Sequence, residues 1–518
     1  MSEKDSLIQD KKIQCNIPYD TASTCEGKVL HLRESLKNNK MASIEYRKSL
    51  LKKLLQLWDK YQNEINLSNY LDLGQTEFVS KFTSFYQVRN EILYNLKNID
   101  NWVKPKKCDS SLLFALSQNY LQPEPYGIAL IFSAWNCNFL TLIIPIAEAI
   151  ASGNLVCAKP AATSPETQKV CMKILNEMPK DAVQCCAGQP EVREKLLSMK
   201  FDLIVFTGSA KIGKIIAKAA AEFLTPTILE LGGQNPVIVD DTANLKTAAY
   251  NITFGRHQIN GQACISPEYV MVDKKVYPKL LQEFKKCYRD FYGDNPKTSN
   301  ELGKMVNKKY TERLINLIKN PGKGATLEYG GLEGCNLENR FITPTIFSFT
   351  DIQTMGESNL AKEELFGPIL YIAPYTNLSE AVNYMNSREK PLTSHLFSNN
   401  ANNKKYVKEN TSAGVLIYND TIIHFIGPYV PFGGVGNSGM GHYHGKFGFD
   451  NMSHLKPIVE QSNLIMSLRY PPYDDNAKKI LEFILRYLPY GRDEILKKVG
   501  IAICSIVISV LLIKYLKK

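Results

Sequence analysis

The segment FDLIVFTGSAKIG, Phe201 to Gly213, passes from an apolar run through a glycine turn into a stretch with helical spacing. The same alternation of short apolar runs and amphipathic stretches extends from Tyr126 to Leu231, and it includes GIALIFSAW, NLVCAKP and AVQCCAG. Strands that alternate with helices along a chain form a parallel sheet with helices on both faces. The sequence therefore predicts an α/β fold.

Polar or glycine-rich residues follow three of these strands, in the segments WNCN, AKP and FTGS. Ligands of open α/β sheets lie outside the carboxyl ends of the strands, so the three segments are expected to face one crevice. Gly208, Ser209 and Gly213 open a helix whose amino terminus suits a phosphate, and Lys159 is placed to contact ribose hydroxyls. The turn lacks the GxGxxG spacing, so a structural glycine turn and a solvated lysine remain the alternatives.

A second α/β region begins after the Gly232-Gly233 pair. PVIVDD is predicted as a strand, a helix runs to about Phe254, and YVMVD is predicted as another strand. A domain junction is therefore expected near residue 232. Residues 27–68 carry leucines at helical spacing between polar faces, which predicts packing helices without a chemical role.

Composition limits the class of protein. A chain of 518 residues fits two or three domains, and its net charge of +11 is spread along the sequence without a nucleic-acid-binding motif. The twelve cysteines lack zinc-type CxxC pairs, and the charged amino terminus lacks the apolar run of a signal peptide. We expect a reducing compartment, free thiols, no metal and no nucleic-acid partner.

Several separated motifs occur together. SAWN contains Asn136, LELGGQNP contains Glu230, GQAC places Cys264 34 residues later, and KEELFGP contains Glu364 and Phe366. With PFGGVGNSGMG at residues 431–441, this set resembles the aldehyde dehydrogenase superfamily. The continuation to SLRYPPY is similar to the class 3 branch, which includes fatty aldehyde dehydrogenases, and the resemblance covers roughly residues 27–475.

The resemblance implies a role for each of these residues. Cys264 is the nucleophile, and the Asn136 side chain and the Cys264 backbone N–H stabilise the oxyanion. Glu230 activates the water that hydrolyses the thioester, while Glu364 holds the nicotinamide ribose or shares the work of the base. Phe366 braces the nicotinamide. The cofactor is NAD, with NADP as a further possibility, and Lys159, Gly208, Ser209 and Gly213 complete its predicted site.

Structural alternatives and departures from the family accompany these roles. Glu230 is alternatively a structural residue at a domain junction, and Asn136 a helix cap. Asn138 replaces the usual proline, which can loosen the loop that aims Asn136, and Ala162 replaces a glutamate of NAD-preferring members, which tolerates NADP. Gln234 and Ala263 replace the usual lysine and threonine without a role in chemistry, and His442 and His444 are assigned no role.

The carboxyl-terminal region carries its own signal. The apolar run Val499 to Ile513 is flanked by lysines, which predicts a short membrane anchor at residues 499–516, with a buried core helix as the alternative. Residues 478–489 predict an amphipathic helix that lies on the membrane or covers a substrate entrance; its apolar face carries Leu481, Ile484, Leu485 and Leu488. The endoplasmic reticulum is the expected membrane, with the catalytic body in the cytosol.

These predictions define an aldehyde dehydrogenase-like α/β architecture. The predicted parts are an NAD(P)-binding domain at 20–103 and 123–231, a catalytic domain at 232–421, a β-hairpin arm for a homodimer at 104–122 and 422–465, and an amphipathic segment at 466–498. The predicted activity is NAD(P)-dependent oxidation of fatty aldehydes to carboxylic acids through a cysteine thiohemiacetal and thioester. The alternatives are a CoA-acylating semialdehyde dehydrogenase and a catalytically silent, membrane-attached binding protein.

Overall fold

The structure is a computed structural model that describes residues 12–110, 117–461, 470–486, 491 and 494–499. These residues fall into two compact units. The first contains residues up to Ile99 and Pro125–Met452, and the second contains Asp100–Glu124 and the chain from Ser453 onward. Each unit is described by itself.

Helices open the first unit, as the leucine spacing predicted for residues 27–68. The first helix, α2, begins after Thr21, whose side chain and that of Thr24 form a capping box. A buried indole then joins the helices to the sheet domain: Trp58 donates from Nε1 to the Phe85 carbonyl at 2.9 Å and meets Phe139 edge-on at 5.5 Å. The elements are α2 (Ala22–Lys37), α3 (Ile44–Lys60), α4 (Gln62–Leu73), α5 (Glu77–Ser80), the π-helical turn Lys81–Phe85 and α6 (Tyr86–Trp102).

A six-stranded sheet follows, in the order β15-β7-β6-β3-β4-β5, and its strands from β7 to β5 are parallel. The predicted apolar runs form these strands: β3 (Ile128–Phe132), β4 (Leu155–Lys159), β5 (Val183–Cys185), β6 (Leu203–Gly208) and β7 (Thr227–Leu231). Register pairs Phe132 with Lys159 and Thr207 with Glu230, so the carboxyl ends of these strands align at one edge. The antiparallel β15 (Gly439–Met440) pairs with β7 beside Glu230.

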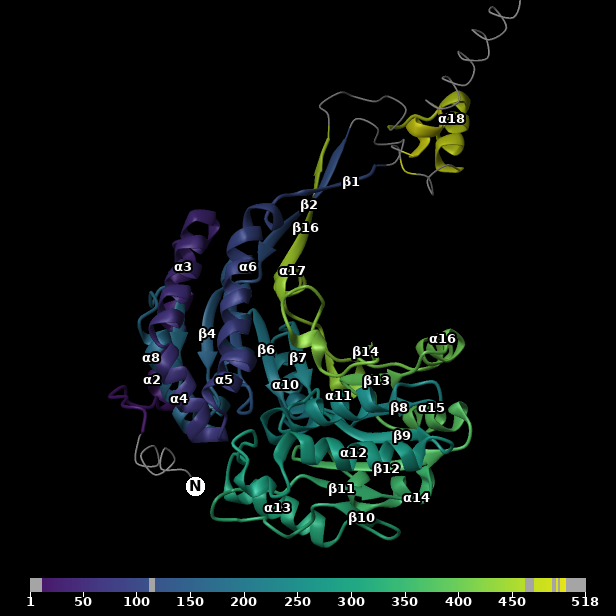
Figure 1. The fold of residues 1–518 in the computed structure, drawn as a ribbon. Helices are drawn as coiled ribbons and strands as arrows, with labels where there is room; N and C mark the ends of the chain where they lie inside the picture. The colour runs from purple at the N-terminus through teal and green to yellow at the C-terminus, as the bar shows by residue number, and fades with distance from the viewer. Residues whose placement is uncertain (1–11, 111–116, 462–469, 487–490, 492–493, 500–518) are drawn as a thin grey trace, which may run out of the picture. The chain divides into compact units, whose positions relative to one another are not determined.

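The helices that connect the strands pack against this sheet: α8 contacts β5, and α10 contacts β6 (Figure 1). The helix that follows β3 is buried along its whole length, as its apolar sequence requires. These helices are α7 (Asn138–Ser152), α8 (Pro165–Asn176), α9 (Pro190–Leu197) and α10 (Ala210–Ala221).

The second predicted α/β region is a seven-stranded sheet, in the order β10-β11-β12-β9-β8-β13-β14. Only the edge strand β10 runs antiparallel to its neighbour among the described pairings. Buried apolar clusters containing Tyr371 and Ile372 occupy the two faces, because neighbouring residues of a strand point in opposite directions. The strands are β8 (Asn235–Val239), β9 (Pro267–Asp273), β10 (Thr326–Tyr329), β11 (Thr345–Ser348), β12 (Ile369–Tyr375), β13 (Thr393–Phe397) and β14 (Val415–Tyr418).

The helices of this region connect and cover those strands. They are α11 (Leu245–His257), α12 (Tyr277–Tyr292), α13 (Lys308–Lys319), α14 (Ile352–Glu357), α15 (Leu378–Asn386) and α16 (Ala401–Asn410). The later helix α17 (Gly445–Asn451) packs on α7 instead. The predicted helix ending near Phe254 is α11, which continues to His257 and leads into the segment that carries Cys264.

The second unit contains the predicted hairpin. β1 (Lys106–Cys108) pairs antiparallel with β2 (Gln118–Pro125), and β16 (Ser453–Glu460) completes a three-stranded sheet. The segment 422–452, which the sequence placed in the arm, belongs to the first unit.

The amphipathic segment of the second unit forms α18 (Asp475–Arg486). Its apolar side chains Ile480, Phe483 and Leu485 are exposed by 45, 59 and 50 %. In the part of the chain that the structure describes, no helix has the length and apolar character needed to span a membrane. The anchor predicted at 499–516 lies, apart from Val499, outside the described residues.

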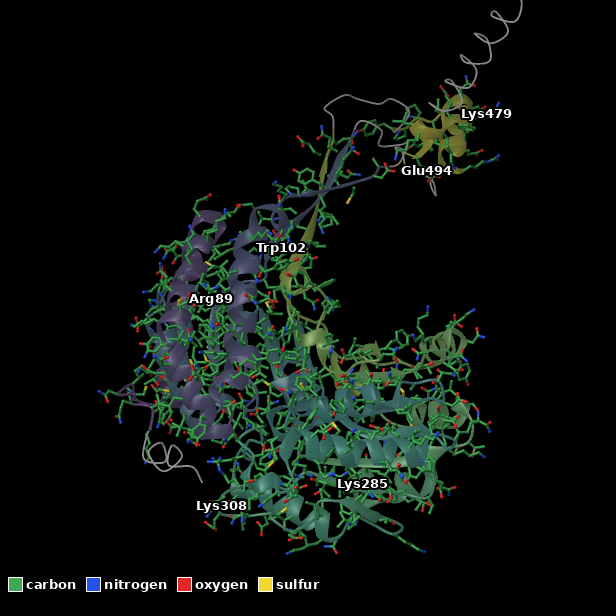
Figure 2. All side chains as sticks on the ribbon, in the orientation of Figure 1. Arg89, Trp102, Lys285, Lys308, Lys479 and Glu494 are labelled. Carbon is green, nitrogen blue, oxygen red and sulfur yellow. The ribbon has the colours of Figure 1, made fainter. Side chains whose placement is uncertain are left out.

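Charged side chains lie on the surface of both units. Figure 2 labels Arg89 on α6, Lys285 on α12 and Lys479 on α18, so basic residues come from elements far apart in the sequence. Many form surface ion pairs, such as Arg89 with Asp59 at 2.9 Å and Lys285 with Glu328 at 2.7 Å. Such exposed pairs contribute little stability.

Candidate active site

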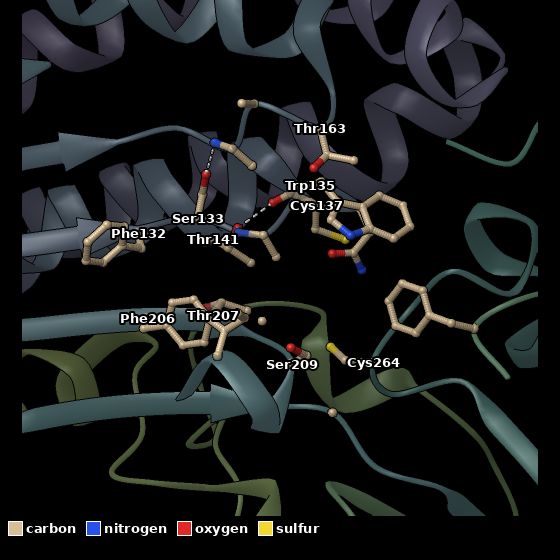
Figure 3. A pocket seen from close by; sticks show the side chains of 18 of the residues that line it. Phe132, Ser133, Trp135, Cys137, Thr141, Thr163, Phe206, Thr207, Ser209 and Cys264 are labelled. Atoms are coloured by element: carbon tan, nitrogen blue, oxygen red, sulfur yellow. Dashed lines mark hydrogen bonds between the residues drawn. The ribbon is translucent and has the colours of Figure 1, made fainter. Parts of the chain in front are cut away.

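A cavity of about 1210 Å³ opens at the carboxyl ends of the six-stranded sheet. The segments after β3, β4, β5, β6 and β7 form one side, and residues of α13, the Cys264 loop and the loop before β12 form the other. Figure 3 shows Cys264 facing Trp135 and Cys137 across this space. The three strand endings singled out in the sequence therefore do face one crevice.

The cavity brings together most of the predicted site residues. Eight of them line it: Asn136, Lys159, Gly208, Ser209, Glu230, Cys264, Glu364 and Phe366. Gly213 does not line it. A Cβ at Gly213 would lie 2.7 Å from Leu231 Cδ2, so this glycine allows α10 to pack closely on the sheet instead.

The Cys264 loop is held by buried amides. The Gln262 side chain accepts from the Val306 N–H at 2.9 Å and donates to the carbonyls of Ile259 and Lys304 at 2.9 and 3.0 Å. Asn235 donates to the Cys264 carbonyl at 2.7 Å. These bonds fix the backbone on both sides of the thiol.

The same loop has a strained backbone immediately before these contacts. Ile259 and Asn260 adopt left-handed conformations with φ of 51° and 54°, which is unfavourable for a β-branched side chain such as that of isoleucine. Surrounding structure must compensate for this strain, and the Gln262 hydrogen bonds supply part of that compensation.

Glu230 is almost fully buried at 2 % exposure, and neither carboxylate oxygen has a conventional hydrogen-bond partner. Burial raises the pKa of Glu230 to about 8, although the Cys264 thiol, a weak donor, opposes part of this rise. Burial and then the negative charge of Glu230 also raise the pKa of the Cys264 thiol. Both groups therefore favour their neutral forms.

The loop that carries Glu364 and Phe366 is anchored by a buried polar cluster. Glu268 accepts from the Leu365 N–H at 3.1 Å, and Arg256 lies 4.0 Å from the same carboxylate. Gln234, which the sequence excluded from the chemistry, also donates to Glu268 at 3.3 Å. Gln234 is thus a support of this loop.

Aromatic side chains border the cavity beside that loop. The ring of Trp135 meets Phe366 edge-on at 5.3 Å and Tyr310 edge-on at 5.2 Å.

Burial and the charge of nearby Glu268 raise the pKa of the Glu364 carboxyl well above its usual range. Glu364, like Glu230, is therefore a carboxylic acid of this cavity whose surroundings favour the neutral form.

Asn136 donates from Nδ2 to the Gln262 carbonyl at 2.7 Å, which joins the loop after β3 to the Cys264 loop. The second hydrogen of this amide is available for another acceptor. Asn138 forms hydrogen bonds to both Ser133 and the loop after β4, so it cross-links this region rather than loosening it. The loop that lacks the usual proline is thus restrained by these side-chain bonds.

The cavity fits an extended dinucleotide. Ser209, Lys211 and Ile212 line it at the amino terminus of the twelve-residue helix α10, where free N–H groups favour a phosphate. At the end of β4, Lys159 is 7 % exposed and donates to the carbonyls of Pro160 and Gly188 at 3.1 and 2.9 Å. The buried Thr207 side chain lines the same space.

One residue near Glu230 has no counterpart in the sequence predictions. Tyr443 is 2 % exposed, and the pKa of its hydroxyl is raised by burial and by the charge of Glu230, while hydrogen bonding to Thr207 opposes that rise. It follows His442 and precedes His444, whose buried imidazole has its pKa lowered to about 4 by loss of solvent. The sequence analysis considered the flanking histidines His442 and His444, but no motif in the sequence marks Tyr443 as a site residue.

Comparison with known proteins identifies the family. Residues 8–458 match the description "Aldehyde dehydrogenase family". Aldehyde dehydrogenase family 3 member H1 of Arabidopsis thaliana is 37 % identical over 460 residues, covering 88 % of this chain and 94 % of the relative. Family 3 member A2 of Rattus norvegicus is 33 % identical over 494 residues, covering 94 and 99 %.

A solved structure agrees with these matches. The substrate-bound state of Staphylococcus aureus AldH is 35 % identical, has a TM-score of 0.84, and covers 88 % of this chain and 99 % of that one. Sequence motifs, fold and relatives thus agree, and the chain belongs to the aldehyde dehydrogenase family, in its family 3 branch.

Proposed function

We propose that this enzyme oxidises apolar aldehydes, in particular medium- and long-chain fatty aldehydes, to carboxylic acids with NAD or NADP. One observation carries the proposal: Cys264, Glu230 and Asn136 line a single cavity whose other walls suit a dinucleotide. Aldehyde oxidation itself agrees with the names of the family 3 relatives.

The residues divide the chemistry between them. The Cys264 thiol gives up its proton to solvent in the cavity, and the resulting thiolate attacks the aldehyde carbon. The Asn136 amide together with the Cys264 N–H stabilises the oxyanion that forms. A bound NAD or NADP would supply the acceptor for the hydride that leaves this carbon. Glu230 then takes a proton from the water that attacks the thioester, and cleavage of the C–S bond releases the carboxylic acid.

Cofactor choice follows from the charges at the end of β4. Lys159, Arg193 and Lys211 line the cavity on the side of the six-stranded sheet, next to Ala162, where no acidic residue contributes to the lining. The acidic side chains lining the cavity are Glu230, Glu363 and Glu364, which lie towards the reacting end. A 2′-phosphate is therefore accommodated without carboxylate repulsion, which supports the use of NADP alongside NAD.

An apolar substrate is supported by exposed side chains of the segment 422–430. Ile423, Ile426 and Tyr429 are exposed by 50, 44 and 73 %. This segment packs on the helical layer, where Phe425 meets Phe82 edge-on at 6.3 Å and the Gly427 N–H donates to Gln87 at 3.2 Å. Exposed apolar side chains concentrated in one loop fit a role in admitting an aliphatic chain.

Membrane attachment extends the same proposal. The apolar run 499–513 supplies an anchor, and the exposed face of α18 with Ile480 and Phe483 suits the membrane surface. The catalytic body then lies in the cytosol at the endoplasmic reticulum. The β1–β2 hairpin, with β16, is proposed to form the contact of a homodimer.

Two other functions fit less well. A CoA-acylating enzyme has no need for a base that activates water, whereas Glu230 lines the cavity with the nucleophile. A silent binding protein has no need for an oriented Asn136 amide in the cavity that the Cys264 thiol lines. The hydrolytic aldehyde dehydrogenase uses all three residues.

A spectrophotometric assay tests the proposal directly. Formation of NADH or NADPH is followed with aldehydes of increasing chain length, and Cys264→Ala serves as the matched inactive variant because a cavity-facing thiol contributes little to packing. We expect activity that increases with chain length, and loss of that activity in the variant with unchanged thermal stability. Turnover that survives in Cys264→Ala would remove the basis of the proposal.

A further inference from the structure

Asn138 makes an unusual set of hydrogen bonds for one side chain. It is 3 % exposed and stands at the first position of α7. Its Oδ1 accepts from the Ser133 hydroxyl at 2.5 Å and lies 3.4 Å from the Ala161 nitrogen. Its Nδ2 lies within 3.1–3.3 Å of three oxygens, which are Ala161 O, Ser164 Oγ and Thr167 Oγ1.

These bonds join three elements at one edge of the sheet. The backbone ladder between β3 and β4 ends where the Ser133 N–H donates to the Lys159 carbonyl at 3.3 Å. Beyond that point the Asn138 amide links the loop after β3 to the loop after β4 and to the start of α8. The Ala161 N–H also donates to Ser133 Oγ at 3.0 Å, as Figure 3 shows.

Both linked loops form walls of the cavity. The loop after β3 carries Asn136, and the loop after β4 runs from Lys159 through Ala162. Asn136 in turn donates to the Gln262 carbonyl in the Cys264 loop. Asn138 therefore ties the loop after β4 to the loop after β3, and the backbone of that second loop carries Asn136, whose amide is bonded to the Cys264 loop.

We propose that Asn138 is a positioning residue that couples cofactor binding to the placement of the Asn136 amide. The inference rests on the proposed function of this cavity. Asn138 itself does not line the cavity, so it acts through the two loops. The Asn138 amide accepts from Ser133 in the loop after β3 and donates to the Ala161 carbonyl in the loop after β4. Movement of the loop after β4 is therefore transmitted to the loop after β3.

Asn154 provides a matched control. It is fully buried in the same sheet domain, accepts from the Gly127 N–H at 3.0 Å, and donates to Ser152 Oγ and the Met452 carbonyl at 2.8 Å each. It does not line the cavity. Asn154→Ala should lower thermal stability about as much as Asn138→Ala while leaving the active site intact.

The experiment compares Asn138→Ala, Asn138→Asp and Asn154→Ala with the wild type. NAD and NADP are titrated by quenching of tryptophan fluorescence, since Trp135 lines the cavity, and kcat and KM are measured with a short soluble aldehyde. The Asp variant keeps the size but places an oxygen opposite the Ala161 carbonyl. We expect both Asn138 variants to weaken cofactor binding and to lower kcat, each by about tenfold, the size of effect that loss of one or two buried hydrogen bonds produces.

Further variants keep the inference testable. Ser133→Ala removes only the Ser133 arm of the link and should give a smaller loss of the same kind, even if Asn138→Ala fails to fold. Asn138→Pro restores a rigid helix start without the amide, so wild-type binding and kcat in that variant would overturn the proposal. Equal effects of Asn138→Ala and Asn154→Ala on binding and kcat would also overturn it. The cofactor titration requires no turnover, so its result stands apart from any failure of the proposed aldehyde oxidation.

Discussion

Glu230→Gln separates the two halves of the proposed reaction. The burial that raises the pKa of Glu230 to about 8 leaves the carboxyl mostly protonated at neutral pH. A general base must be ionised, and a pKa near 8 makes about a tenth of the groups ionised at pH 7 and about nine tenths at pH 9. Hydrolysis of the acyl-enzyme should therefore rise about tenfold across this range in the wild type.

The substitution should remove this pH dependence. Glutamine has the same shape, and the Glu230 oxygens have no conventional partner to lose, so the variant should fold normally. Loss of a general base typically slows a step by about 10²- to 10⁴-fold. The Glu230→Gln enzyme should still release one reduced cofactor per site in a stopped-flow burst and then almost stop.

Two measurements check this expectation. Mass spectrometry of the Cys264 peptide should show accumulated acyl groups in Glu230→Gln, and steady-state rates from pH 6 to 9 should show a rising limb in the wild type alone. If the variant turns over within about threefold of the wild type and keeps the rising limb, Glu230 is not the base. Glu364, whose pKa is also raised by burial, would then be the candidate to replace it.

Three other changes test separate parts of the molecule. Ala162→Glu should shift the preference towards NAD by about tenfold, the effect of one charge repulsion of about 1.4 kcal/mol, and competitive titration of NADP checks it. Glu91 and Glu148 are buried together, and burial raises the pKa of both carboxyls. A raised folded-state pKa gives stability that is present at acidic pH and lost as pH rises from the unfolded-state pKa through the folded-state pKa. Glu148→Gln should therefore flatten the fall in melting temperature as pH rises above the ordinary glutamate range, and an unchanged slope would contradict this. Deletion of residues 499–518 should release the protein from membranes without changing activity on a short soluble aldehyde, while activity on vesicle-dissolved long-chain aldehyde falls; a truncated protein that still sediments with vesicles would argue against the anchor.

The sheets could be predicted from the sequence because their signals are local. Each parallel strand is a continuous apolar run, since both of its faces are covered, and the amphipathic stretches between strands give the helices. The candidate site residues were also predictable, because few side chains can act as a nucleophile, a base or an oxyanion donor. Cys264, Glu230 and Asn136 accordingly line one cavity.

Helix ends and supporting residues were harder to predict. The amphipathic helix was expected from residue 478, but α18 begins at Asp475, because the Asp474 carboxylate caps it by accepting from the Ala477 N–H at 2.7 Å. No sequence motif marks Tyr443 or Glu148, because a single buried polar residue acquires its role only from groups that are distant in the sequence. For Glu148 that group is the His444 N–H, 2.7 Å away and 296 residues later in the chain.

Asn138 shows how a departure from a family motif can mislead when it is considered alone. Proline would limit the backbone at this position, so its loss suggested a looser loop. The asparagine amide instead restrains the same loop from its side chain, by bonds to Ser133 and to Ala161. The two residues constrain different things: proline fixes one φ angle, whereas the amide fixes the distance between two walls of the cavity. A sequence motif records only the first kind of restraint, and for this reason the coupling between the cofactor side and the oxyanion side emerges only when both loops are seen together.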